Sequence, residues 1–115
     1  MFTGVDKMNF VKIVSIIRPE NLGKVEDTLK ELNVPGVSVS HIKGYGEYEN
    51  FFRHDRMVEH IQLEVFIGKK RATEIAEKIM NVAHTGIEGD GIVAIIPVES
   101  VYHIRTKHKC GDEVC

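Results

Sequence analysis

Hydrophobic positions in the first half of the chain predict a strand, a helix and a second strand. Residues 10–17 are rich in β-branched side chains, which is typical of a strand. The segment 37–43 begins with alternating positions and ends at glycines, so we expect a second strand there. Between them, Pro19 opens a helix that residues 34–36 end, and its apolar side chains recur at helical spacing: Leu22, Val25, Leu29 and Leu32.

The hydrophobic pattern of the second half predicts another strand, helix and strand. Alternating apolar positions at 61, 63, 65 and 67 predict a third strand, and helical spacing follows at Ala72, Ile75, Ala76, Ile79 and Met80. A loop over residues 84–92 separates that helix from a last strand. The order strand, helix, strand, strand, helix, strand is typical of a ferredoxin-like α+β sandwich, with two helices on one face of an antiparallel sheet. The other face needs a cover, for which we expect a partner subunit.

Composition bounds the class of protein. The 115 residues are 43% hydrophobic and 28% charged with a net charge of −2, as expected for one globular domain and not for a nucleic-acid partner. No apolar run is long enough to span a bilayer, and residues 1–10 lack the features of a signal peptide. We therefore expect a cytoplasmic protein that is not itself embedded in a membrane. Residues 1–8 lie outside the first strand, as an N-terminal extension, an expression remnant or a mobile arm.

The loop after the second predicted helix carries the candidate chemistry. Gly86, Gly89 and Gly91 leave backbone amides unobstructed, and such a loop can cradle phosphate oxygens. Asp90 lies among them, where it can contribute to a site or complete an Asx turn that satisfies the loop backbone. The alternative is a plain tight connection between two elements.

Three motifs in this order resemble the PII signal-transduction family. Residues 43–46, Lys-Gly-Tyr-Gly, are similar to the start of the family's mobile T-loop, and residues 85–91 are similar to its nucleotide-binding B-loop. Residues 104–106, Ile-Arg-Thr, are similar to its C-terminal signature. The resemblance covers residues 9–106, leaves 107–115 as a tail, and implies a homotrimer that binds adenine nucleotides between subunits.

The resemblance also implies which residues bind the nucleotide. Glycines and Asp90 of the loop would lie under the phosphates, Arg105 would pair with phosphate oxygens, and four residues would lie near the base and sugar. The implied nucleotide-binding residues are Ile16, Ser38, Gly44, Tyr45, Gly46, His60, Glu64, Thr85, Gly86, Gly89, Asp90, Gly91, His103 and Arg105.

Several family cations are missing from this sequence. Ile92 replaces a lysine after Gly-Asp-Gly, His103 replaces an arginine on the last strand, and His60 replaces a lysine entering the third strand. Each lost cation removes a charge-assisted bond to phosphate, so we expect ADP or AMP to be favoured over ATP. The two histidines either restore charge when protonated, near pH 6 to 7, or stay neutral hydrogen-bonding groups.

The T-loop counterpart, residues 47–56, is shorter than is usual in the family. Glu47 and Tyr48 replace an arginine and a glutamine, which puts the family's 2-oxoglutarate site in doubt. Two adjacent phenylalanines in the loop either pack against the trimer or anchor a partner protein. The candidate partner-binding residues are Glu47, Tyr48, Phe51, Phe52 and Arg53.

The tail contains both cysteines of the chain, Cys110 and Cys115. A small disulfide between them is feasible, and in the cytoplasm it would act as a redox switch. A reduced, disordered tail is one alternative. A metal site that also uses His103 and His108 is another, although the spacing is not that of a standard zinc module.

Two classes of function follow. The first is a non-enzymatic regulator that senses adenine nucleotides and controls a membrane transporter or a metabolic enzyme in nitrogen or inorganic-carbon metabolism. The second is a metal-responsive trimer of the same fold, linked to metal efflux. We assign no catalytic residues, because no nucleophile is paired with an evident base and no paired carboxylates are present.

Overall fold

The computed structural model describes residues 9–46, 50–51 and 53–111, and its core is a four-stranded antiparallel sheet. The strands are β1 (Phe10–Ile17), β2 (Ser38–Gly44), β3 (Val58–Gly68) and β4 (Gly91–Val98), in the order β2-β3-β1-β4. β1 therefore lies at the centre between β3 and β4. The predicted ferredoxin-like α+β fold is confirmed.

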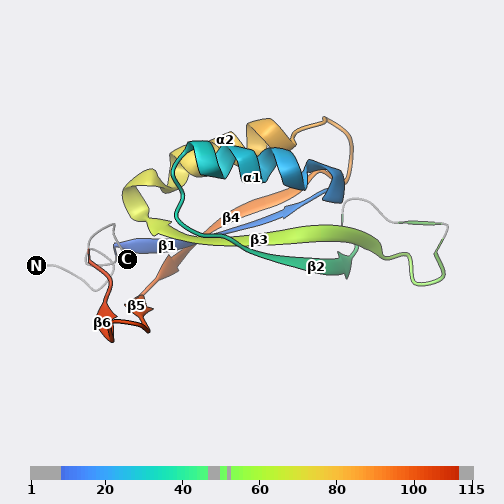
Figure 1. The fold of residues 1–115 in the computed structure, drawn as a ribbon. Helices are drawn as coiled ribbons and strands as arrows, with labels where there is room; N and C mark the ends of the chain where they lie inside the picture. Colours follow the sequence, from blue (N-terminus) through green and yellow to red (C-terminus); the bar gives the residue numbers. More distant parts are fainter. Residues whose placement is uncertain (1–8, 47–49, 52, 112–115) are drawn as a thin grey trace, which may run out of the picture.

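Two helices cover one face of this sheet (Figure 1). α1 (Leu22–Glu31) follows a 3-10 turn, η2 (Pro19–Asn21), and α2 (Ala72–Ala83) follows a second one, η3 (Lys69–Arg71). Side chains tie the helix ends together: the Asn21 amide donates to the Ala83 carbonyl oxygen at 3.3 Å, and the Arg71 guanidinium donates to the Leu32 carbonyl oxygen. These bonds satisfy carbonyls that a helix end leaves without an intrahelical partner.

The hydrophobic core lies between the helices and the sheet. Alternate residues of β1 and β3 point toward the helices, because successive side chains of a strand leave on opposite faces. They meet the apolar sides of α1 and α2 there. The most deeply buried apolar side chains are Ile13, Ile17, Val25, Ile61, Leu63, Val65, Ile75 and Ile79.

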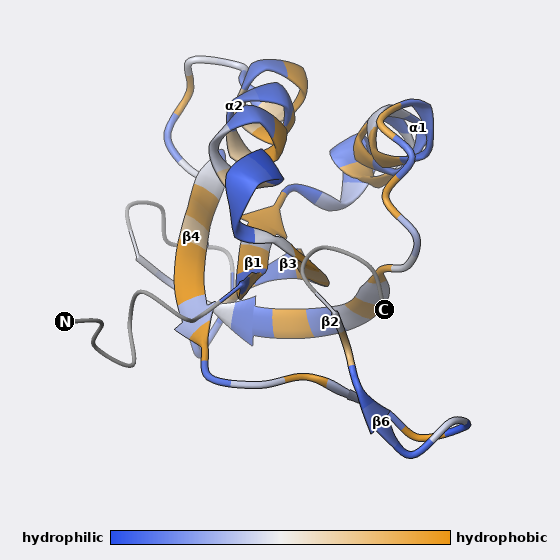
Figure 2. Cartoon of the chain, turned by 90° about the vertical axis from the view of Figure 1, so that its left-hand side faces the viewer, coloured by the Kyte–Doolittle hydropathy of each residue, from blue (hydrophilic) through white to orange (hydrophobic). Residues whose placement is uncertain are grey.

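The opposite face of the sheet carries a row of apolar residues that the helices do not cover. Val14 lies between Glu64 of β3 and Ala94 of β4, and Ile16 lies between Gln62 and Ile92 in the next row. Ile92, Ile96 and Phe66 expose between 41% and 61% of their surface. Hydropathy colouring shows that β4, at the edge of the sheet, is a largely hydrophobic strand (Figure 2). Such a face is expected to meet another subunit.

The C-terminal part departs from the sequence prediction. β4 ends at Val98, and residues expected on the same last strand form a separate hairpin of β5 (Tyr102–His103) and β6 (His108–Lys109). The hairpin is held by bonds from the Lys107 amide to the His103 carbonyl and from the Cys110 amide to the Val101 carbonyl. β3 also begins three residues before the predicted alternation. Among the described residues, no helix is long and apolar enough to cross a membrane.

Candidate functional site

The glycine loop, residues 84–91, connects α2 to β4 and depends on glycine at three positions. Gly86, Gly89 and Gly91 have φ angles of +85°, +97° and +102°, a region that other residues avoid. At Gly91 the constraint is also steric, because a Cβ atom would lie 1.7 Å from the Ile16 carbonyl oxygen. The loop therefore approaches β1 more closely than any side chain would allow.

The Asp90 carboxylate organises this loop from within. One oxygen accepts bonds from the Thr85 and Gly86 amides at 2.8 and 2.9 Å, and the other accepts the Thr85 hydroxyl. The Thr85 hydroxyl and these amides hold the pKa of Asp90 well below its usual range, despite partial desolvation. Asp90 therefore stays charged at neutral pH and ties the beginning of the loop to its end.

Arg18 is a site residue that the sequence analysis missed. Its Nε donates to Asp90 Oδ1 at 3.0 Å, and its Nη2 donates to the Ile87 and Glu88 carbonyl oxygens at 3.3 and 2.7 Å. The pairing of Ile17 with Gly91 in neighbouring strands places the next residue, Arg18, beside Asp90. A cation directly after the first predicted strand was the signal available in the sequence.

His60 closes the other side of the loop. Its Nε2 lies 3.0 Å from the Gly89 carbonyl oxygen, and because a carbonyl only accepts, Nε2 is the protonated nitrogen in this contact. His60 sits near the beginning of β3, so the glycine loop is held by residues from both β1 and β3.

A cavity of about 300 Å³ opens between the glycine loop and the base of the T-loop. It brings together many of the residues that the resemblance implied for nucleotide binding, and it adds two isoleucines from β2 and β4 that were not among them. The lining residues are Ile16, Ile42, Gly44, Tyr45, Gly46, His60, Gly89, Gly91 and Ile92.

The other implied nucleotide-binding residues lie elsewhere. Thr85, Gly86 and Asp90 belong to the glycine loop but do not line this cavity. Ser38 pairs with Glu64 farther along the sheet, on its uncovered face.

His103 and Arg105 lie in the hairpin region beyond the far end of β4 (Figure 1). β4 has eight residues, so its ends are separated by about 25 Å. Arg105 therefore cannot reach the glycine loop of its own chain.

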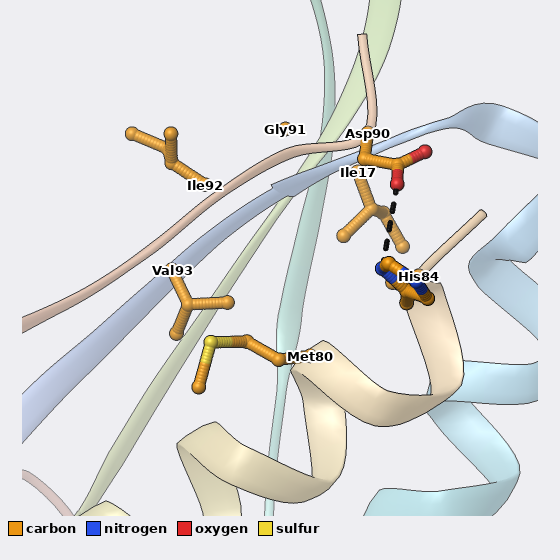
Figure 3. A pocket seen from close by; sticks show the side chains of 8 residues that line it. Ile17, Met80, His84, Asp90, Gly91, Ile92 and Val93 are labelled. Atoms are coloured by element: carbon orange, nitrogen blue, oxygen red, sulfur yellow. Dashed lines mark ion pairs between the residues drawn. The ribbon is translucent and has the colours of Figure 1, made fainter. Parts of the chain in front are cut away.

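A second cavity, of about 350 Å³, lies on the helix side of β4 beside the same loop. Figure 3 shows Met80 and Val93 on its walls and His84 near Asp90, where Nδ1 lies 3.9 Å from the carboxylate. Gly91 and Ile92 line both cavities, so β4 forms a thin wall between them.

The described part of the T-loop counterpart is a turn braced by charged side chains. Arg53 donates to both oxygens of Asp55 at 3.1 and 3.2 Å, and the Arg56 guanidinium lies 5.4 Å from the centre of the Phe51 ring. Phe51 is 72% exposed, so most of its surface is not packed against the described residues. The candidates Glu47, Tyr48 and Phe52 lie outside the described residues.

The tail is described as far as Gly111. Cys110 is disulfide-bonded in the structure, whereas Cys115 lies outside the described residues, so the pairing of the two stays a prediction. Within residues 9–46, 50–51 and 53–111, no group of three or more His, Cys, Asp or Glu side chains is placed to hold a metal ion. The metal-responsive alternative therefore gains no support from this part of the chain.

These features define a class: a ferredoxin-like domain in which a glycine loop and a neighbouring strand base enclose a small-molecule cavity. The model of the family described as nitrogen regulatory protein P-II matches residues 10–108. The chain belongs to this P-II family.

Comparison with individual proteins supports this membership. The nitrogen regulatory protein P-II of Azospirillum brasilense is 34% identical over 110 residues, which cover 90% of this chain and 98% of the relative. That of Cyanidium caldarium is 31% identical over 112 residues, covering 91% and 99%. The solved structure of Arabidopsis thaliana PII bound to citrate is 30% identical with a TM-score of 0.76, and the match covers 88% of each chain.

Membership gives the general function. P-II proteins are non-catalytic regulators of enzymes and transporters, they bind adenine nucleotides, and the family implies a trimer. The chain is therefore a divergent P-II regulator. Its uncovered apolar sheet face agrees with the implied trimer.

Proposed function

We propose that the cavity beside the glycine loop binds an adenine nucleotide in a cleft between subunits, and that it favours ADP or AMP over ATP. The observation that carries the preference is Ile92. It lines the cavity where the resemblance leads us to expect a lysine, and 61% of its surface is exposed. An apolar side chain at this position gives no charge-assisted bond to a phosphate.

The rest of the lining supports the same preference. Among the described lining residues, His60 is the one histidine, lysine or arginine, and its Nε2 is already engaged by the Gly89 carbonyl. A triphosphate carries about four negative charges, which this lining neutralises poorly. Shorter phosphate chains need fewer cations, so the small number of cations in the lining weakens the binding of ADP and AMP less than that of ATP.

A neighbouring subunit would complete the site. Arg105 and His103 are too far from the loop of their own chain, and Ser38 and Glu64 face the uncovered side of the sheet. In a trimer these residues of one subunit would lie against the cavity of the next. Arg105 would supply a bidentate contact to phosphate, whereas the described lining of the cavity contains no arginine.

Calorimetric titration with ATP, ADP and AMP, each with and without Mg²⁺, tests the proposal. We expect ADP and AMP to bind more tightly than ATP. Ile92→Lys should raise ATP affinity relative to ADP by about tenfold, because one charge-assisted bond contributes roughly 1.5 kcal/mol. Thr73→Lys is the matched control: it adds the same charge to an exposed position at the beginning of α2, away from the glycine loop and the cavity.

Two results would count against the proposal. Tighter binding of ATP than of ADP by the unmodified protein would contradict the preference. Failure to bind any of the three nucleotides would contradict the site itself.

We also propose that the T-loop counterpart docks on the regulated enzyme or transporter through Phe51. A phenylalanine that is 72% exposed and stacked against Arg56 has the character of an interface anchor. Phe51→Ala should abolish regulation of the partner while leaving the ADP affinity unchanged. Normal regulation by this variant would favour packing of Phe51 within the trimer.

A further inference from the structure

Three consecutive carbonyl groups of the glycine loop are held by side chains from outside it. Arg18 Nη2 bonds to the carbonyl oxygens of Ile87 and Glu88, and His60 Nε2 bonds to that of Gly89. The Arg18 Nε also fixes Asp90, which in turn holds the amides at the start of the loop. We call Arg18, His60 and Asp90 the loop clasp.

The clasp controls where the loop amides point. In a planar trans peptide the C=O and the following N–H point in opposite directions. Fixing the carbonyls of residues 87–89 therefore fixes the N–H directions of residues 88–90. These lie in the segment that a phosphate group would contact, and backbone amides stabilise an anion only when they converge on it.

Arg18 is largely committed to this task. Its Nε and Nη2 are both engaged within the loop, and its side chain is 24% exposed. Arg18 does not line the cavity that we propose for the nucleotide. Its charge is also balanced locally, because it forms an ion pair with Asp90 at 3.0 Å.

We propose that Arg18 is a positioning residue for phosphate binding: it acts through the loop carbonyls and Asp90, without contacting the nucleotide. This inference rests on the proposed function. It identifies a residue of the site that lies in the loop clasp and outside the cavity lining. His60 assists it from the side of β3.

The first test compares ligands with and without phosphate. Arg18→Gln should weaken ADP binding by roughly tenfold, the effect of losing charge-assisted bonds that order the loop. Its affinity for adenosine should not change, because adenosine has no phosphate. Arg18→Lys keeps the charge without the fork of donors and should restore only part of the ADP affinity.

Arg71→Gln is the matched control. Arg71 also donates from its guanidinium to a carbonyl, that of Leu32, but at the opposite end of the helical layer. This variant loses a bond of the same kind, from a guanidinium to a carbonyl, and should keep full ADP affinity. Equal losses in both variants, or an equal loss of adenosine affinity in Arg18→Gln, would overturn the positioning role and indicate general destabilisation.

Amide hydrogen exchange in the nucleotide-free protein separates the clasp from a direct contact. The Thr85 and Gly86 amides donate to Asp90, so loosening the clasp in Arg18→Gln should accelerate their exchange. Unchanged exchange would overturn the clasp, and faster exchange with unchanged ADP affinity would overturn its role in binding.

A double variant checks the route. If Arg18 and Asp90 both act by ordering the same loop, Arg18→Gln combined with Asp90→Asn should lose less ADP affinity than the product of the two single losses. Multiplying losses would indicate two independent contacts and overturn the proposal. If the unmodified protein binds no ADP, the proposed function fails along with this inference, whereas the exchange result still reports on the clasp alone.

Discussion

Gly91 shows at the scale of a single residue how β4 and the glycine loop are joined. Its φ of +102° and the 1.7 Å approach of a hypothetical Cβ to the Ile16 carbonyl oxygen leave no room for a methyl group. Gly23 in α1 has nothing within 4 Å of the same atom, and Gly86 has a positive φ with more space. The three glycines therefore have different structural requirements.

Gly91→Ala should lower the free energy of unfolding by about 2–4 kcal/mol, through backbone strain and the clash with β1. Gly86→Ala should cost about 1 kcal/mol for its conformation alone. Gly23→Ala should stabilise the protein by roughly 0.5–1 kcal/mol, because alanine favours the helix. Urea denaturation at one fixed protein concentration measures all three, and equal effects at Gly91 and Gly86 would contradict the steric argument.

At the level of residues, the sequence predicted the glycine loop but not the side chains that hold it in place. The glycines and Asp90 stand out in the printed sequence, and Asp90 was expected either in a site or in a turn. Its bonds to the Thr85 and Gly86 amides satisfy the loop backbone, but they reach upstream residues and not the following amide that an Asx turn uses. Arg18 was missed because its partners lie about 70 positions away in the sequence, and only the pairing of β1 with β4 brings them together.

At the scale of elements, α2 is a half-buried helix with sharply different faces. Ile79 is 1% exposed in the core, whereas its neighbour Met80 is 50% exposed beside β4. The two side chains have similar volume and lie on the same helix. Substituting each of them therefore shows how much a buried side chain contributes to the free energy of unfolding, compared with an exposed one.

Ile79→Ala should lower the free energy of unfolding by about 2–5 kcal/mol, because it removes buried methyl groups and leaves a cavity. Met80→Ala should change it by less than about 1 kcal/mol. Thermal or urea denaturation of both variants, at the same protein concentration, makes the comparison. Similar losses would mean that Met80 is buried in the assembled protein, against a neighbouring subunit.

Element boundaries followed the hydrophobic pattern where the segments are long. β1 has the predicted limits, and β2 and both helices begin close to where the spacing placed them. The hairpin of β5 and β6 was not predicted, because strands of two residues contain too few positions for a period to show. Its formation depends on backbone bonds around Lys107 and Cys110 that leave no hydropathy signal.

At the scale of the whole molecule, the uncovered sheet face sets the assembly. Val14 lies at the centre of this face, between Glu64 and Ala94 of the flanking strands. Neither helix covers it, and the family implies a trimer. The face is therefore the surface on which we expect subunits to meet.

Val14→Asp should disrupt the trimer, because it would bury a second carboxylate beside Glu64 at the subunit contact. Light scattering coupled to gel filtration should give the mass of a smaller species. Lys24→Asp on the exposed side of α1 is the control and should leave the mass unchanged. A trimeric Val14→Asp protein would show that the contact lies on another surface.

The sequence alone determined the order and type of the main elements and the apolar sides of both helices, and it singled out the glycine loop as the candidate site. These features follow from the local periodicity of hydrophobic residues and from the conformational freedom of glycine. Both are properties of residues that are close together in the sequence. Only the tertiary structure decided that Arg18 and His60 hold that loop, that Ile42 and Ile92 complete the cavity, and that Arg105 lies beyond the far end of β4. Those facts depend on strand register and on contacts between distant residues, and no local pattern encodes them.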